Sequence, residues 1–260
     1  MNKDPRHLRN FRQEFLSGIG VPEPAPFSED LFQTEAIKSL AEGVDTLVVA
    51  PTGTGKTHIA IEGIRNAIKS GKRAIYTAPL KALSNTKYGE FKRTFEPDYR
   101  VGLLTGDRKI EGDANVVVAT TEIYRNELFR ISENYGLVIL DEFHYLADSQ
   151  RGPVWEESII LSPTSATLLM LSASISNAKE IAHWIETIRG KPTRIITETS
   201  RRVELRLGFL HPQFGVIPLT HDGERVLAEV SQVYRGGGKF FGQNAGPARG
   251  PVRGKFRKKR

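Results

Sequence analysis

The sequence predicts an α/β fold with a mainly parallel sheet and helices on both faces. Short runs rich in Val, Ile and Leu recur along the chain and alternate with amphipathic stretches long enough to form helices. The runs are apolar on both faces, as expected of strands buried between two layers of helices. Ligands of such sheets bind at the carboxyl ends of the strands, so functional motifs are expected there.

Each predicted strand is four to eight residues long. The strands are predicted over 46–50, 73–78, 101–105, 115–120, 137–141, 167–174 and 194–197. Helices between them are predicted over 56–69, 81–95 and 177–189.

The two ends of the chain differ in composition from its middle. Residues 1–26 finish in a proline-rich stretch that prevents regular structure, so this part is predicted to be an extended N-terminal segment. The main domain is predicted over 27–211, followed by a crossing segment and short helix over 212–234. Residues 235–260 are rich in Gly, Arg and Lys and have little apolar surface, which predicts a disordered basic tail.

The net charge of +7 resides in that tail. Nine of the 37 basic residues lie from Arg235 onward, where there is no acidic residue, which leaves 28 basic against 30 acidic groups before it. A polyanion would therefore bind the main domain through local patches. The tail is interpreted either as a tether for nucleic acid or as a solvated linker.

Composition also narrows the protein class. The chain has no cysteine, which excludes disulfides and thiolate metal sites and fits a reducing compartment. It has no apolar run near the ~20 residues that a membrane helix needs, so no membrane partner is expected. The expected location is the cytoplasm, or the nucleus in a eukaryote.

A phosphate-binding loop follows the first predicted strand and opens the next helix. Its glycines allow backbone N–H groups to face phosphate oxygens, and the helix adds its positive dipole end. Lys56 is expected to reach the β- and γ-phosphates of ATP, and the Thr57 hydroxyl to ligate Mg²⁺. The alternative is a glycine turn with an exposed lysine, which the flanking strand and helix disfavour. The residues predicted to bind ATP are Thr52, Gly53, Thr54, Gly55, Lys56 and Thr57.

Two acidic residues lie at the carboxyl end of the predicted strand 137–141, one as its last residue and one directly after it. Asp141 is expected to hold Mg²⁺ through its water shell, and Glu142 to orient or deprotonate the water that attacks the γ-phosphate. The alternative is an ordinary solvated acidic turn. His144 has no partner at metal-ligand spacing, so it is interpreted as a link between the nucleotide site and a neighbouring domain rather than as a zinc ligand.

These strings resemble motifs of the superfamily 2 DExH-box helicases. The resemblance lies in 50–57 for motif I, in Asp-Glu-Phe-His over 141–144 for motif II, and in Ser-Ala-Ser over 172–174 for motif III. The string Arg-Gly-Pro-Val-Trp-Glu-Glu over 151–157, with 171–177 and His-Trp-Ile over 183–185, resembles the superkiller-type RNA helicases associated with the exosome. The resemblance covers about residues 27–211.

The resemblance implies a RecA-like three-layer motor domain that moves 3′ to 5′ along single-stranded RNA, with RNA-decay machinery as a partner. Ser172 and Ser174 would couple hydrolysis to strand movement, although the family usually has threonine at the second position. Phe27 and Gln33 would recognise adenine. The alternative places Phe27 in the core and Gln33 in solvent.

The RNA-facing positions also come from the resemblance. They follow predicted strand ends and offer hydroxyls, backbone N–H groups and one lysine, which suit sequence-independent phosphate contacts. Helix capping by Thr121 is compatible with that role. The positions are Pro79, Lys81, Thr105, Gly106, Asp107, Thr120 and Thr121.

One part of the family's machinery is missing from the sequence. No Gln-x-x-Gly-Arg-x-Gly-Arg string follows, although the arginines of a second RecA-like domain accelerate hydrolysis about 10³–10⁵-fold. The chain is therefore expected to hydrolyse ATP weakly alone, and to be part of a longer protein or to need a partner chain. A DNA-repair helicase and a non-catalytic ATP-gated RNA-binding module remain alternatives.

Overall fold

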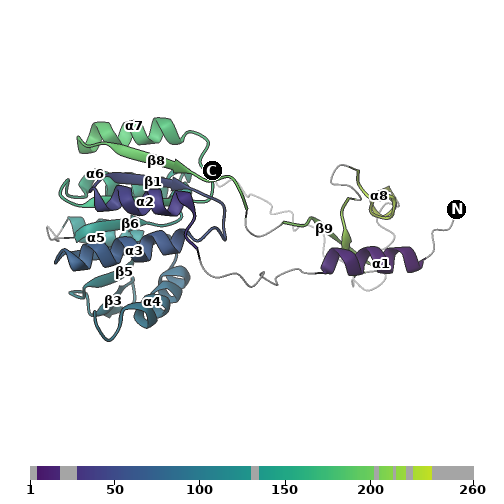
Figure 1. The fold of residues 1–260 in the computed structure, drawn as a ribbon, viewed down its shortest axis with the longest axis horizontal. Helices are drawn as coiled ribbons and strands as arrows, with labels where there is room; N and C mark the ends of the chain where they lie inside the picture. The colour runs from purple at the N-terminus through teal and green to yellow at the C-terminus, as the bar shows by residue number, and fades with distance from the viewer. Residues whose placement is uncertain are drawn as a thin grey trace, which may run out of the picture. The chain divides into compact units, whose positions relative to one another are not determined.

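The computed structural model describes residues 5–17, 28–129, 135–201, 205–212, 215–220 and 225–235. The chain divides into two compact units, drawn in Figure 1. The larger unit is Ala25–Arg202, and the smaller unit combines Met1–Pro24 with Val203–Arg260. Phe27 and the predicted disordered tail beyond Arg235 lie outside the described residues.

The larger unit contains an eight-stranded sheet in the order β4-β3-β5-β2-β6-β7-β1-β8. Every neighbouring pair is parallel except β3 with β4, which confirms the predicted α/β fold with a mainly parallel sheet. The strands are β1 (Asp45–Val49), β2 (Arg73–Ala78), β3 (Val101–Leu104), β4 (Lys109–Ile110), β5 (Val116–Thr120), β6 (Tyr135–Leu140), β7 (Thr167–Ser172) and β8 (Thr193–Thr197).

All seven predicted strands are present, and their ends differ from the prediction by at most two residues. The additional strand, β4, has two residues and lies at the edge of the sheet. Because Lys109 is exposed and Ile110 is only partly buried, β4 has no apolar run that a sequence pattern would detect.

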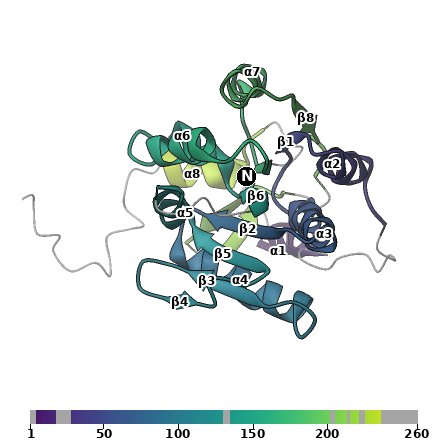
Figure 2. The same ribbon diagram turned by 90° about the vertical axis from the view of Figure 1, so that its left-hand side faces the viewer.

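Helices cover both faces of the sheet, as Figure 2 shows. The first layer packs its apolar side chains against one face and the second layer against the other, so the core has two clusters. Successive strand residues alternate between the clusters: Ile75 belongs to one and Tyr76 to the other. The first layer is α2 (Leu31–Ala41), α3 (Lys56–Lys69) and α4 (Lys81–Phe95), and the second is α5 (Thr121–Leu128), α6 (Gly152–Leu161) and α7 (Ala178–Arg189).

The smaller unit contains α1 (Pro5–Leu16), an antiparallel pair β9 (Gly208–His211) and β10 (Gly215–Pro218), and α8 (Ala228–Arg235). Helix α1 differs from the extended segment that the sequence predicts over 1–26. That prediction rested on prolines that all follow the helix, whereas Leu8, Phe11 and Phe15 have helical spacing.

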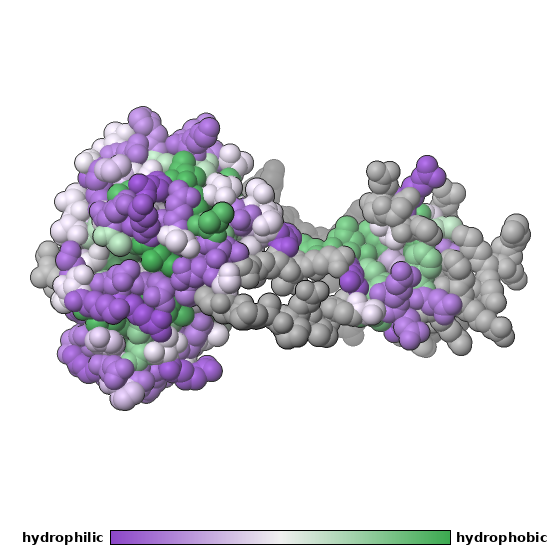
Figure 3. All heavy atoms as spheres, viewed as in Figure 1, coloured by the Kyte–Doolittle hydropathy of each residue, from purple (hydrophilic) through white to green (hydrophobic). Residues whose placement is uncertain are grey.

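One face of the larger unit is mainly polar. In Figure 3 the face over α2, α3 and α4 carries mostly hydrophilic side chains, with small apolar areas between them. Among the described residues, no helix is both long and apolar enough to span a membrane.

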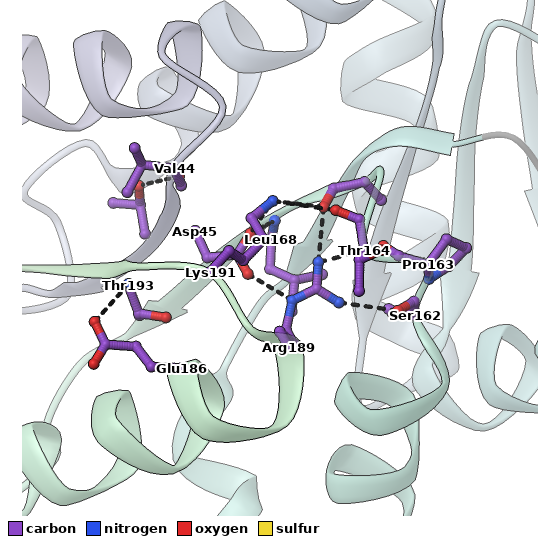
Figure 4. Close-up of polar contacts among 12 residues, drawn as sticks. Val44, Asp45, Ser162, Pro163, Thr164, Leu168, Glu186, Arg189, Lys191 and Thr193 are labelled. Carbon is purple, nitrogen blue, oxygen red and sulfur yellow. Dashed lines mark hydrogen bonds and ion pairs between the residues drawn. The ribbon is translucent and has the colours of Figure 1, made fainter.

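A buried ion pair holds the amino end of β1 (Figure 4). Arg189, the last residue of α7, is 1% exposed and donates from Nε to Asp45 Oδ2 at 2.5 Å. Its other nitrogens donate to the carbonyl oxygens of Ser162 at 3.0 Å and Ala166 at 2.7 Å. The remaining Asp45 oxygen accepts from the backbone N–H of Leu168 at 2.8 Å. One guanidinium therefore connects β1, α7 and the loop between α6 and β7.

Replacing Arg189 with methionine should destabilise the protein by about 3 kcal/mol, because the Asp45 carboxylate loses its buried partner and keeps only the more exposed Lys191 ammonium, 3.2 Å from its Oδ1. The free energy of unfolding in urea measures this loss. Arg194→Met is the matched control, since Arg194 pairs with Glu42 at 3.2 Å on the surface and should contribute less than about 1 kcal/mol. Equal losses in the two variants would contradict the structural role of Arg189.

Candidate nucleotide site and nucleic-acid-facing edge

The predicted motifs converge at the carboxyl edge of four adjacent strands, β2, β6, β7 and β1. Two backbone hydrogen bonds join the carboxyl ends of neighbouring strands directly. The N–H of Ala50, before the phosphate loop, donates to Ser172 O at 3.0 Å, and the N–H of Asp141 donates to Thr77 O at 3.0 Å. Motifs I, II and III are thus neighbours in space.

The phosphate loop has the backbone shape that anion binding requires. Gly53 and Gly55 adopt φ of +88° and +84°, values that residues with a Cβ atom rarely adopt. Thr54 is buried, and its hydroxyl donates to Pro51 O at 2.8 Å, which holds the turn. Helix α3 begins at Lys56, so its first unpaired N–H groups and positive dipole end lie at the loop.

Gln33 fastens the loop to α2. Its side chain is 2% exposed, and its amide Nε2 donates to Thr54 O at 3.0 Å and Gly55 O at 3.4 Å. Its Oε1 accepts from the Asp30 N–H at 2.9 Å, completing a capping box at the start of α2. The alternative in which Gln33 is exposed is therefore wrong. Adenine recognition by Gln33 and Phe27 stays a prediction.

Lys56 lies between backbone carbonyls and two carboxylates. Its ammonium donates to Ala50 O at 2.6 Å and Pro51 O at 3.1 Å. Burial lowers the Lys56 pKa, and the negative charges of Glu142 and Asp141 oppose that shift only in part. The loop lysine and the acidic pair of motif II therefore interact electrostatically, as a shared phosphate and metal site requires.

Tyr76 orients Asp141, a role that no sequence motif indicates. The Tyr76 hydroxyl, in the middle of β2, donates to Asp141 Oδ2, and the Glu142 N–H donates to Oδ1 at 2.9 Å. Burial and the adjacent Asp141 charge raise the Tyr76 pKa well above its usual value, so the hydroxyl stays a donor. Within an apolar run, this tyrosine looks like an ordinary core residue.

Lys87 is a second site residue that no sequence motif indicates. From the second turn of α4, its ammonium donates to Thr57 Oγ1 at 2.8 Å and to Glu90 Oε2 at 2.9 Å. Thr57 is the predicted magnesium ligand of α3. The Thr57 hydroxyl and the Asp141 carboxylate are hard oxygen donors, which fit Mg²⁺.

Glu142 has an unusual backbone conformation. Its φ of +54° and ψ of +44° belong to the left-handed region, which is uncommon for a residue with a side chain. Directly after β6, this turn places the Glu142 carboxylate 3.5 Å from His144 Nδ1, with both side chains partly exposed. Strain of this kind concentrates at functional sites, and here it coincides with the predicted water-positioning residue.

Several of the predicted RNA-facing residues meet beside α4. Lys81 Nζ lies 3.1 Å from Asp107 Oδ1, which also accepts from the Thr105 hydroxyl at 2.9 Å. The Thr105 hydrogen bond, followed by the Lys81 contact, lowers the Asp107 pKa. A Cβ added at Gly106 would lie 3.8 Å from the Lys81 side chain, so the turn is close to the lysine. Pro79 is buried just before α4.

The start of α5 differs from the capping arrangement considered for Thr121. The helix begins at Thr121, and Thr120 is its N-cap residue, without a side-chain capping hydrogen bond. The Thr121 hydroxyl is buried and has no hydrogen-bond partner among the described residues. Backbone N–H groups, rather than the Thr121 hydroxyl, are thus the groups that this helix start can offer to a phosphate.

Motif III lies against the phosphate loop. Ser172, at the end of β7, is buried, and its hydroxyl donates to Ser174 O at 3.3 Å. The Ser172 carbonyl accepts a hydrogen bond from the Ala50 N–H, so a shift of one strand end would also displace the other. The coupling role of Ser172 and Ser174 stays a prediction.

Replacing Gln33 with alanine should weaken the binding of ADP and GDP by similar factors, because the loop carbonyls lose a buried donor whichever base is bound. The lost hydrogen bonds should also lower the free energy of unfolding by about 1–3 kcal/mol. Fluorescent analogues of both nucleotides measure the affinities, and Thr34→Ala, at an exposed neighbour, is the control. A loss restricted to adenine nucleotides would instead demonstrate base recognition.

Comparison with known proteins agrees with this geometry. Residues 30–181, more than half of the chain, match the family model described as DEAD/DEAH box helicase. Similar curated proteins include a chloroplastic DExH-box ATP-dependent RNA helicase of Arabidopsis thaliana, 46% identical over 87% of this chain and 20% of that protein. The antiviral helicase SKI2 of Saccharomyces cerevisiae is 42% identical over 72% of this chain and 15% of its own length.

The probable helicase HelY of Mycobacterium tuberculosis is 45% identical over 66% of this chain and 19% of that protein. The chain thus spans about a fifth or less of the length of these relatives. Among solved structures, the DUF1998 helicase MrfA bound to DNA superposes with a TM-score of 0.57 at 21% identity, covering 72% of this chain and 29% of that one, and supports the fold. With its RecA-like sheet and its converging motifs, the chain belongs to the DEAD/DEAH box helicase family.

Proposed function

We propose that this chain is the ATP-binding motor domain of an ATP-dependent RNA helicase, which hydrolyses ATP with Mg²⁺ to move 3′ to 5′ on single-stranded RNA. The observation that carries the proposal is that two consecutive elements, β2 and α4, contribute to both the proposed nucleotide site and the proposed RNA-binding edge. Strand β2 supplies Tyr76 to Asp141 of the nucleotide site and then leads into α4, which supplies Lys81 to the nucleic-acid-facing edge. ATP chemistry and RNA contacts thus share one strand and one helix.

The side chains divide the work of hydrolysis between them. Lys56 and the backbone of the phosphate loop hold the phosphates, and Glu142 orients the attacking water. Thr57, and Asp141 through a water molecule, would hold Mg²⁺, which when bound would supply positive charge to the β- and γ-phosphates. Tyr76 keeps the Asp141 carboxylate in place throughout, because its hydroxyl stays protonated.

RNA is the proposed substrate because the Arabidopsis relative is named an RNA helicase and the yeast relative an antiviral helicase. The Caenorhabditis elegans relative, 38% identical over 92% of this chain and 23% of that protein, is named mRNA transport homolog 4. RNA-decay machinery is the proposed partner. The observed edge suits strand binding without sequence preference, since Lys81, Thr105 and the α5 N–H groups would meet phosphates.

The proposed motor needs a second RecA-like domain, in the same or another chain. Within the described residues, Lys56 is the cation that the phosphate loop itself supplies, and family chemistry uses additional arginines at the γ-phosphate. The domain alone is therefore proposed to bind Mg²⁺–ATP weakly and to hydrolyse it slowly.

Glu142→Gln should lower the ATPase kcat by about 10²–10⁴-fold, because glutamine cannot accept a proton from the attacking water. ATP binding should persist, since the phosphate loop is unchanged. Steady-state phosphate release and equilibrium binding of a fluorescent ATP analogue measure the two effects. Glu156→Gln, at an exposed position on α6, is the control. Equal rates in wild type and Glu142→Gln would favour a non-catalytic ATP-gated binding module.

Lys81→Ala should weaken binding of single-stranded RNA of every sequence and reduce the slope of log K against log salt by about 0.7, the value for one lost phosphate contact. Fluorescence anisotropy over a salt series measures both quantities. Lys92→Ala, at an exposed position on the same helix, should leave the slope unchanged. Matched single-stranded DNA serves as competitor, and stronger binding of DNA would support a DNA-repair motor instead.

A further inference from the structure

The ammonium of Lys87 occupies a position that the predicted function does not use. The side chain is 19% exposed, and its nitrogen contacts the Thr57 hydroxyl at 2.8 Å and Glu90 at 2.9 Å. It also lies 5.9 Å from the centre of the Tyr76 ring, whose hydroxyl binds Asp141. Lys87 is therefore among the groups that surround the proposed metal position.

An ammonium and a magnesium ion cannot share the Thr57 hydroxyl favourably. Mg²⁺ binds oxygen at about 2.1 Å and demands strict geometry. A cation 2.8 Å from the same oxygen would lie within a few ångströms of the metal, where like charges repel strongly in a partly buried site. The hydrogen bond from Lys87 and ligation of Mg²⁺ by Thr57 are thus alternative states of one oxygen atom.

Glu90 provides a second acceptor for the Lys87 ammonium. It lies one turn after Lys87 on α4, and its carboxylate already accepts from the ammonium. An ammonium that leaves Thr57 can therefore keep its charge paired without leaving α4. The pair is partly exposed, with the Glu90 side chain 38% accessible. The Lys87 side chain therefore has room to move toward Glu90 and solvent.

We infer that Lys87 competes with Mg²⁺ for the Thr57 hydroxyl, and that Glu90 receives the ammonium when the metal binds. Lys87 is in this sense a positioning residue that sets the metal affinity of the nucleotide site. The inference rests on the proposed ATP site. In the Thr57-bound state Lys87 also ties α4 to α3, so metal binding would release a contact of the helix that begins at Lys81.

The test measures metal binding directly in the 260-residue chain. Electron paramagnetic resonance follows the loss of the free Mn²⁺ signal as Mn²⁺ is added to protein with ADP, and Mg²⁺ competition repeats the measurement. Lys87→Gln should lower the metal concentration for half-saturation by about fivefold to tenfold, because the competing cation is gone. Lys87→Arg, which keeps the charge, should resemble wild type.

Glu90→Gln should shift half-saturation the other way, to about twofold to fivefold more metal, because the displaced ammonium loses its acceptor. Lys92→Gln is the matched control on the same helix, since its ammonium lies 3.6 Å from Glu96 on the surface. Melting temperatures of all variants, and ADP affinity in EDTA, show that the fold and the phosphate loop are intact.

An unchanged or higher metal requirement in Lys87→Gln would overturn the inference, since Lys87 would then be neutral or supportive toward the metal. If Lys87→Gln showed this metal requirement but bound ADP normally, the proposed ATP site would still be supported. Failure of the wild-type chain to bind ADP with or without metal would overturn the proposed function, and the inference with it.

Discussion

The pairing of Asp45 with Arg189 anchors the strand on which the nucleotide site depends. Strand β1 is buried along its whole length and pairs with β7 and β8, so it cannot move without disturbing both neighbours. At its amino end Asp45 is held by Arg189 and by the Leu168 N–H. Its carboxyl end leads directly into the phosphate loop. An interaction at the amino end of β1 thus helps to determine where phosphates would bind at its carboxyl end.

Around the loop, neighbouring elements restrain each reactive group before any ligand arrives. Gln33 holds the loop carbonyls from α2, and Tyr76 holds the Asp141 carboxylate from β2. The Glu142 backbone is kept in the left-handed region, two residues after the buried carboxyl end of β6. Such preorganisation suits phosphoryl transfer, in which a protein acts mainly by positioning and by electrostatics.

Helix α4 brings the two halves of the site together. Its first residue, Lys81, lies at the proposed RNA-binding edge, and Lys87 reaches the proposed magnesium ligand Thr57. Lys87 lies six positions after Lys81, about 9 Å further along the helix axis. A rigid element of this length would carry a displacement from one end to the other, which would link the proposed RNA contacts to the state of the bound nucleotide.

The sequence by itself determined seven of the eight strands of the large sheet, the order of motifs and the phosphate loop, because these depend on local patterns. Runs such as 73–78 must be buried on both faces, and Gly53 and Gly55 permit backbone shapes that few other residues adopt. Tertiary structure decided what local patterns do not contain. Tyr76 and Lys87 look like core and surface residues until β2 is placed beside β6 and α4 beside α3. Gln33 and Arg189 act through partners 21 and 144 positions away, and only the folded chain brings those partners within hydrogen-bonding distance.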